Sequence, residues 1–142
     1  MIVRPAGPAD VAALAELRDI TDLGPFTDWM ATHAESHVPF VAEVDGHVVG
    51  SAWLLIAERV PGGNATTRHF GDIQSVMVRE AHRNRGIGAA LIAAILTEAR
   101  TRRLEHVTVH SGRRAVDFYV RNGFTHHRQL LLWEPEAHLF TS

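Results

Sequence analysis

The 142-residue sequence contains no cysteine. This absence excludes a disulfide framework, a thiolate nucleophile and a thiolate metal site. No apolar run approaches the length of a membrane span, and the first residues lack the basic-then-apolar pattern of a signal peptide. We therefore expect a cytoplasmic protein with no membrane partner. The net charge is −2 and the sequence pI about 6.5, so the basic footprint of nucleic-acid binding is missing and no nucleic-acid partner is expected.

The hydrophobic content of 46% is enough for one packed core, and the length is too short for two ordinary domains. We expect one domain over residues 1–142, without repeats, linkers or low-complexity tracts. Hydrophobic periodicity predicts an α/β protein. The predicted helices cover about 8–19, 25–35, 86–102 and 113–122, and the predicted strands about 2–5, 38–44, 47–58, 69–78, 105–110, 124–127 and 129–134.

The most informative feature is a glycine-rich turn, Arg83 to Gly88, between two different hydrophobic patterns. A short β-branched run over 73–78 predicts a buried strand, and apolar residues at helical spacing follow the turn. A strand that enters a helix through such a turn directs free backbone N–H groups and the positive end of the helix dipole at one place. Gly86 and Gly88 let an anion approach the backbone closely. The pattern predicts a phosphate or pyrophosphate site.

Two common phosphate loops do not fit these residues. A P-loop needs Lys and then Ser or Thr after its second glycine, but Ala89 and Ala90 follow Gly88. A dinucleotide-binding fingerprint needs a third Gly or Ala at the position of Leu91, and a second βαβ unit that is not visible. A glycine-rich turn that binds no ligand is the remaining structural alternative.

The pattern Arg83-x-x-Gly86-x-Gly88 resembles the acetyl-coenzyme A pyrophosphate loop of the GNAT superfamily of N-acetyltransferases. About thirty residues later, the segment from Ala115 to Phe124 resembles the Ala-x-x-Phe-Tyr-x-x-x-Gly-Phe segment of the same superfamily. The first strand and helix, and the hairpin predicted over 41–50, also fit in the right order. The resemblance therefore covers nearly the whole chain.

The resemblance implies a mixed, mostly antiparallel sheet of about six to seven strands, flanked by about four helices. It also implies an acetyl-CoA-dependent enzyme that moves the acetyl group to a primary amine by direct attack on the thioester. The alternative is a non-catalytic acyl-CoA-binding module on the same fold. The residues implied in acetyl-CoA binding are Val76, Met77 and Val78 through their main chain, Arg83, Asn84, Arg85, Gly86, Ile87, Gly88, Ala89, Ser111, Ala115, Phe118 and Tyr119.

Tyr119, the only tyrosine of the chain, lies at the motif position that faces the coenzyme A sulfur in the superfamily. A phenol with a pKa near 10 can protonate a departing thiolate. The structural alternative is a half-buried tyrosine on an amphipathic helix. Relatives often carry an asparagine where this chain has Gly112, so either the Ser111 hydroxyl or the Gly112 N–H is expected to replace it.

The general base is less well defined by the sequence. Asp72 matches the carboxylate of one branch of the superfamily, whereas another branch carries it at the position of Gln74, which cannot act as a base. His69 is a second candidate, and a water chain without a dedicated base is a third. Strand alternation predicts that residues 72, 74, 76 and 78 share one face of the sheet.

The acceptor is expected to be a small-molecule or peptide amine, bound by residues around 20–30 and 59–69, which shape that pocket in the superfamily. Asp22, Asp28, Phe26 and Trp29 offer an acidic, aromatic-walled site, although both rings also fit core contacts of a helix. The ten histidines are scattered without metal-ligand spacing, so no metal is expected. A homodimer through the C-terminal strands is compatible with the sequence, which does not establish it.

Overall fold

The computed structural model describes residues 1–135, and the chain separates into two compact units, Met1–Val109 and His110–Ser142. Each unit is described by itself. Within the described residues, no helix is both long and apolar enough to cross a membrane.

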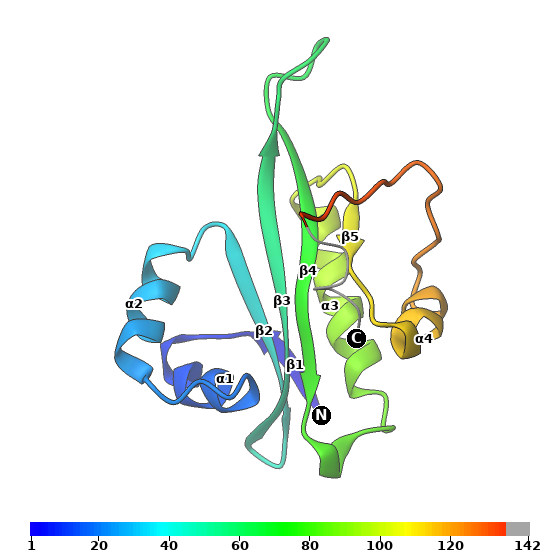
Figure 1. Cartoon of the computed structure of the whole chain (residues 1–142). Helices are drawn as coiled ribbons and strands as arrows, with labels where there is room; N and C mark the ends of the chain where they lie inside the picture. The colour runs from blue at the N-terminus through cyan, green and yellow to red at the C-terminus, as the bar shows by residue number, and fades with distance from the viewer. Residues whose placement is uncertain (136–142) are drawn as a thin grey trace. The chain divides into compact units, whose positions relative to one another are not determined.

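The first unit is built on a five-stranded sheet in the order β1-β2-β3-β4-β5 (Figure 1). The sheet is mixed, because β4 and β5 are parallel while every other neighbouring pair is antiparallel. Asp45 and Gly46, with φ of 51° and 79°, form the tight turn between β2 and β3 that their sequence predicts. The strands are β1 (Ile2–Pro5), β2 (His37–Val44), β3 (His47–Arg59), β4 (Arg68–Val78) and β5 (Val107–Val109).

Helices cover both faces of this sheet (Figure 1). One face packs against α1 (Val11–Leu17) and α2 (Leu23–Thr32), with Leu14, Val41 and Trp53 at the buried centre. The other face packs against α3 (Ile87–Thr101). A Cβ atom at Gly50 would lie 3.2 and 3.3 Å from the side chains of Ile87 and Leu91, so glycine at this position lets α3 lie close to the sheet.

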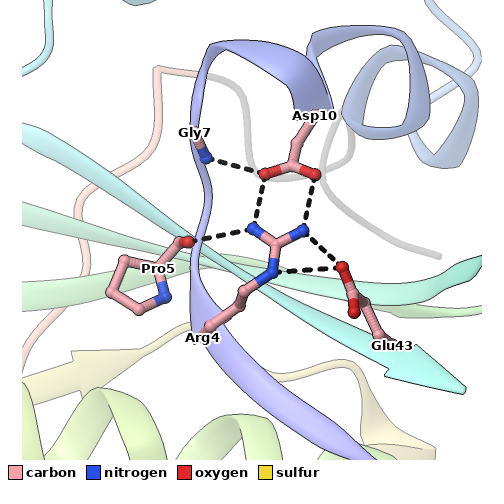
Figure 2. A network of polar contacts seen from close by, with 5 residues as sticks. All are labelled: Arg4, Pro5, Gly7, Asp10 and Glu43. Carbon is pink, nitrogen blue, oxygen red and sulfur yellow. Dashed lines mark hydrogen bonds and ion pairs between the residues drawn. The ribbon is translucent and has the colours of Figure 1, made fainter. Parts of the chain in front are cut away.

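A polar network fixes the start of the chain to the sheet (Figure 2). The Arg4 guanidinium donates to both carboxylate oxygens of Asp10, at 2.7 and 2.9 Å, and to Glu43 on β2. The Gly7 N–H donates to Asp10 at 2.7 Å. Asp10 is buried, and its hydrogen bonds with Arg4 hold the pKa of its carboxyl below the usual value. The Arg4 guanidinium therefore joins β1, the 3-10 helix η1 (Pro8–Asp10) and β2 through the carboxylates of Asp10 and Glu43.

The second unit contains the 3-10 helix η3 (Arg113–Ala115) and α4 (Val116–Arg121), with Gly123 at φ 102° after the helix. The predicted strands at 124–127 and 129–134 are wrong, because the structure has no strand from 124 to 135. The side chains over 130–133 are 65 to 89% exposed. An apolar run becomes a strand only when a neighbouring strand satisfies its backbone, and the described residues supply none. The sheet therefore has five described strands instead of six or seven.

Candidate active site

Among the described strands, none pairs with the β5 side of β4 beyond residue 73. β5 pairs only with residues 71–73, while β3 pairs along the whole strand. The Arg79 N–H donates to Val49 O at 2.8 Å, which makes 49 and 79 a hydrogen-bonded pair. Antiparallel ladders alternate, so Val78 and Val76, opposite Gly50 and Ala52, direct their N–H and C=O groups away from β3. Both residues thus direct a main-chain N–H at the open edge, and Val76 also directs its C=O there, whereas the Val78 C=O accepts from Arg83.

Met77 does not share this arrangement. It lies opposite Ser51 in the hydrogen-bonded phase of the ladder, so its N–H and C=O groups face β3. Of the three main-chain positions that the sequence assigned to acetyl-CoA, the structure leaves Val76 and Val78 open and uses Met77 within the sheet.

A β-bulge at Gln74 changes the phase of the strand. Leu54 pairs with Ile73 and Trp53 with Ser75, so Gln74 has no opposite residue. Asp72 therefore lies opposite Leu55, on the α1/α2 face, whereas Val76 lies opposite Ala52, on the other face. The prediction that 72, 74, 76 and 78 share one face was wrong, because the extra residue interrupts the two-residue period.

The turn between β4 and α3 presents a row of unpaired backbone donors. After the 3-10 helix η2 (Glu80–His82), Asn84 and Gly86 adopt positive φ of 63° and 80°, and α3 begins at Ile87. Within residues 1–135, the N–H groups of residues 84 to 89 donate to no acceptor, and the first N–H after them, that of Ala90, donates to Gly86 O. Ile87 is buried and anchors the turn to the core. Such a concave run of N–H groups at the start of a long helix suits a diphosphate.

Arg83 connects the turn to the open edge of β4. Its Nε donates to Val78 O at 3.1 Å, and its side chain is otherwise exposed. Asn84, Arg85, Gly88 and Ala89 lie in the same turn or in the first turn of α3. The structure thus brings together the loop residues that the sequence assigned to the anion.

Asp72 lies in a polar cluster close to the bulge. Thr108 Oγ1 donates to one carboxylate oxygen and Gln74 Nε2 to the other, each at 2.5 Å. His69 lies opposite Glu58, three residues before Asp72 without an intervening bulge, so it points to the other face. The two candidate bases are therefore not brought together. The sequence analysis missed Thr108, although it is the polar residue between Val107 and Val109 on the parallel neighbour of β4.

The second unit holds the remaining predicted residues. The Tyr119 ring is half-buried, in edge-to-face contact with Phe118 and Phe124 at centroid distances of 5.0 and 5.6 Å. Burial raises the pKa of the Tyr119 phenol, which keeps it protonated at neutral pH. The Ser111 hydroxyl donates to Gly112 O at 2.7 Å, and the Ala115 N–H bonds to the same oxygen. The Ser111 hydroxyl proton is therefore already engaged.

On the acceptor side, α2 divides its aromatic residues between the core and the surface. Phe26 packs against the buried centre and lies 6.2 Å from Trp53, ring centroid to ring centroid. Trp29 is 38% exposed, and Asp22 and Asp28 are exposed. Among the described residues, no group of three or more His, Cys, Asp and Glu side chains is arranged to hold a metal ion.

The sequence matches the model of the Acetyltransferase (GNAT) family over residues 9–124. A glucosamine 6-phosphate N-acetyltransferase of Trypanosoma brucei brucei is 33% identical over 94 residues, which cover 66% of this chain and 62% of that protein. The matched region thus spans less than two thirds of that curated relative.

Solved structures share the fold. An acetyltransferase from Trypanosoma brucei has a TM-score of 0.78 and 22% identity, covering 94% of this chain and 98% of that chain. A predicted acetyltransferase from Clostridium acetobutylicum, solved with acetyl-CoA, has a TM-score of 0.76 and 17% identity, covering 94% and 95% of the two chains. With a family model that matches most of its length, this chain belongs to the GNAT family of acetyltransferases.

Proposed function

We propose that residues 1–142 act as one acetyl-CoA-dependent N-acetyltransferase domain that acetylates a primary amine by direct attack on the thioester. The observation that carries this proposal is the run of N–H groups from 84 to 89, which have no acceptor among residues 1–135, beside the open edge of β4 at Val76 and Val78. The first feature suits the diphosphate of coenzyme A, and the second suits the amide groups of its pantetheine arm.

In the proposed reaction, the lone pair of the neutral amine attacks the thioester carbonyl carbon, and the carbonyl oxygen becomes an oxyanion. The Val76 N–H, directed at the open edge and the nearer of the two open donors to Asp72, is the proposed donor to this oxygen. Collapse of the intermediate breaks the C–S bond and releases the coenzyme A thiolate. The products are the N-acetylated amine and coenzyme A.

Two proton transfers complete the proposed reaction, one from the attacking nitrogen and one to the departing thiolate. Asp72, directly or through water, takes the proton that the attacking nitrogen loses. The support is its place beside the bulge, where the neutral side chains of Gln74 and Thr108 are its hydrogen-bond partners among the described residues. Tyr119 gives a proton to the thiolate, and its support is the motif position together with the burial that raises its pKa. The acceptor is a small-molecule or peptide amine, and an amine is also the acceptor that the name of the trypanosomal relative implies.

The experiment is a titration of the purified chain with acetyl-CoA by calorimetry, followed by thiol detection in the presence of an amine panel. Saturable binding with amine-dependent release of coenzyme A is expected. Binding without thiol release for any amine would instead indicate a non-catalytic acyl-CoA-binding module. Absence of binding would contradict both functions.

A further inference from the structure

A row of four residues crosses the α1/α2 face of the sheet near the end of α2. The register places His37 opposite Leu55, Leu55 opposite Asp72, and Asp72 opposite Thr108. All four side chains are half-buried, in contrast to Trp53 two residues before Leu55, which is 5% exposed. The row is therefore an accessible strip of sheet with an imidazole and a carboxylate on either side of a leucine.

An aromatic wall borders the His37 end of this strip. The Trp29 ring of α2 stacks on His33 at 4.3 Å and contacts the ring of His37 edge-to-face at 4.9 Å, measured between ring centroids. Burial lowers the pKa of His37, so its imidazole is neutral at pH 7 and does not repel a cation. Trp29 keeps 38% of its surface exposed, although it also lies 6.1 Å from Trp53. The wall thus offers aromatic surface without positive charge from His37.

The other end of the strip is acidic. Asp72 accepts hydrogen bonds only from the neutral groups of Thr108 and Gln74. Two arginines on the same face, Arg59 and Arg68, are both engaged by Glu105, and Arg68 also donates to Val60 O. Among the described contacts, the Asp72 carboxylate therefore has no cationic partner of its own. It lies about 9–10 Å, two strand spacings, from the backbone of His37.

We propose that this strip binds the acceptor as a primary ammonium carried on an aromatic or planar apolar body, with the nitrogen at Asp72 and the body over Leu55 against Trp29. The proposal rests on the proposed function and specifies its acceptor class. A cation at Asp72 gains a charge partner, and an aromatic body covers apolar surface that small polar amines would leave in water. An ammonium near the indole gains a further attraction from the ring.

The test compares three amines at saturating acetyl-CoA: 2-phenylethylamine, ethanolamine and glucosamine 6-phosphate. We expect kcat/KM for 2-phenylethylamine to exceed both others by about tenfold or more, because only this amine fills the apolar part of the strip. Equal or faster turnover of glucosamine 6-phosphate or ethanolamine, with acetyl-CoA still bound, would overturn the acceptor class and leave the acetyltransferase intact.

The variant that tests the wall is Trp29→Leu, which keeps apolar volume and removes the ring. It is expected to raise KM for 2-phenylethylamine by about 3- to 30-fold, with KM for acetyl-CoA unchanged. Phe26→Leu is the matched control, because it removes a ring of the same helix that packs against the core. A loss of similar size in the control, or an unchanged KM in Trp29→Leu, would contradict the proposal.

Equilibrium binding of 2-phenylethylamine, measured by calorimetry in the wild-type chain and in Trp29→Leu, tests the strip separately from catalysis. Binding that is weakened by about 3- to 30-fold in Trp29→Leu supports the strip even if no thiol is released, in which case the catalytic proposal alone fails. Absence of binding to the wild-type chain overturns the strip as the acceptor site.

Discussion

Arg83 Nε donates to the carbonyl oxygen of Val78 at 3.1 Å, and this contact joins the start of the glycine-rich turn to the last residue of β4. The Arg83 side chain thus connects the two parts of the proposed acetyl-CoA site, one for the diphosphate and one for the pantetheine arm.

Replacing this side chain is expected to weaken cosubstrate binding. Arg83→Ala removes the contact to Val78 and a positive charge near the proposed diphosphate, so KM for acetyl-CoA should rise by about 5- to 20-fold. KM for the amine should stay within about twofold. Steady-state kinetics with each substrate varied in turn measures both. A change confined to the amine would place Arg83 outside the acetyl-CoA site.

The turn conformation can be tested with a matched pair of glycines. Gly86 and Gly46 have φ of 80° and 79°, and a Cβ atom at either position would meet no atom of the described residues within 4 Å beyond its chain neighbours. Alanine at either position costs roughly 1 kcal/mol of backbone strain, so the two variants should lose similar melting temperature.

Only Gly86→Ala is expected to weaken acetyl-CoA binding in calorimetry, by about tenfold, because only this residue shapes the donor row. If Gly46→Ala weakened binding equally, the effect would be one of general stability.

The proposed role of Tyr119 predicts that its loss lowers kcat without changing the affinity for acetyl-CoA. Tyr119→Phe keeps the ring contacts with Phe118 and Phe124 and removes the phenolic proton, so kcat should fall by about 10- to 100-fold while acetyl-CoA affinity is unchanged. Because burial raises the pKa of the phenol, the donor is protonated below its ordinary pKa of about 10. The wild-type rate should therefore not decline through loss of this proton until more alkaline pH. An unchanged kcat in the variant would remove Tyr119 from the mechanism.

Asp72 is expected to act on the amine. Asp72→Asn preserves the shape of the cluster with Thr108 and Gln74 but removes the base, and kcat should fall by about 10- to 100-fold. Thr108→Val leaves the carboxylate in place without one hydrogen bond and should produce a smaller loss. The ratio of the two rates, measured by thiol release, distinguishes a base from a water chain. Equal, near-wild-type rates in both variants favour the water chain.

The network around Arg4 predicts a pH-dependent contribution to stability. Hydrogen bonds from Arg4 hold the folded pKa of Asp10 below its unfolded value of 3.8. The contribution is therefore fully present above about pH 4–5 and is lost as the pH falls through the folded pKa. Asp10→Ala should reduce the free energy of unfolding by about 1–3 kcal/mol at pH 7, measured by urea denaturation. The difference in the free energy of unfolding between the wild type and Asp10→Ala should shrink as the pH falls below about 4. A constant difference across the pH range would contradict this account.

Much of the first unit could be predicted because local patterns determine it. The β-branched apolar run of the central strand placed it at about 69–78, and the structure has Arg68–Val78, followed by the helix at Ile87–Thr101 where 86–102 was expected. The bulge at Gln74 could not be read from the chain, because the phase of a strand depends on its hydrogen-bonded neighbours. The same reason explains why Met77 was grouped with its two neighbours, and why the contact of Thr108 with Asp72 was missed.

The last two strands, at 124–127 and 129–134, were predicted from the sequence but do not form in the described residues. Leu130 to Trp133 read as a strand by composition, but β-propensity reflects packing against neighbours that the described residues do not provide.

The central claim, that unpaired main-chain donors hold acetyl-CoA, is tested most directly by residue-resolved amide hydrogen exchange followed by NMR, with and without acetyl-CoA. The N–H groups of residues 84–89, Val76 and Val78 should exchange fast in the free protein and slow down when acetyl-CoA is bound. The Met77 N–H, which faces β3, should be protected in both states. Binding of acetyl-CoA that leaves the exchange of these open donors unchanged would contradict the account.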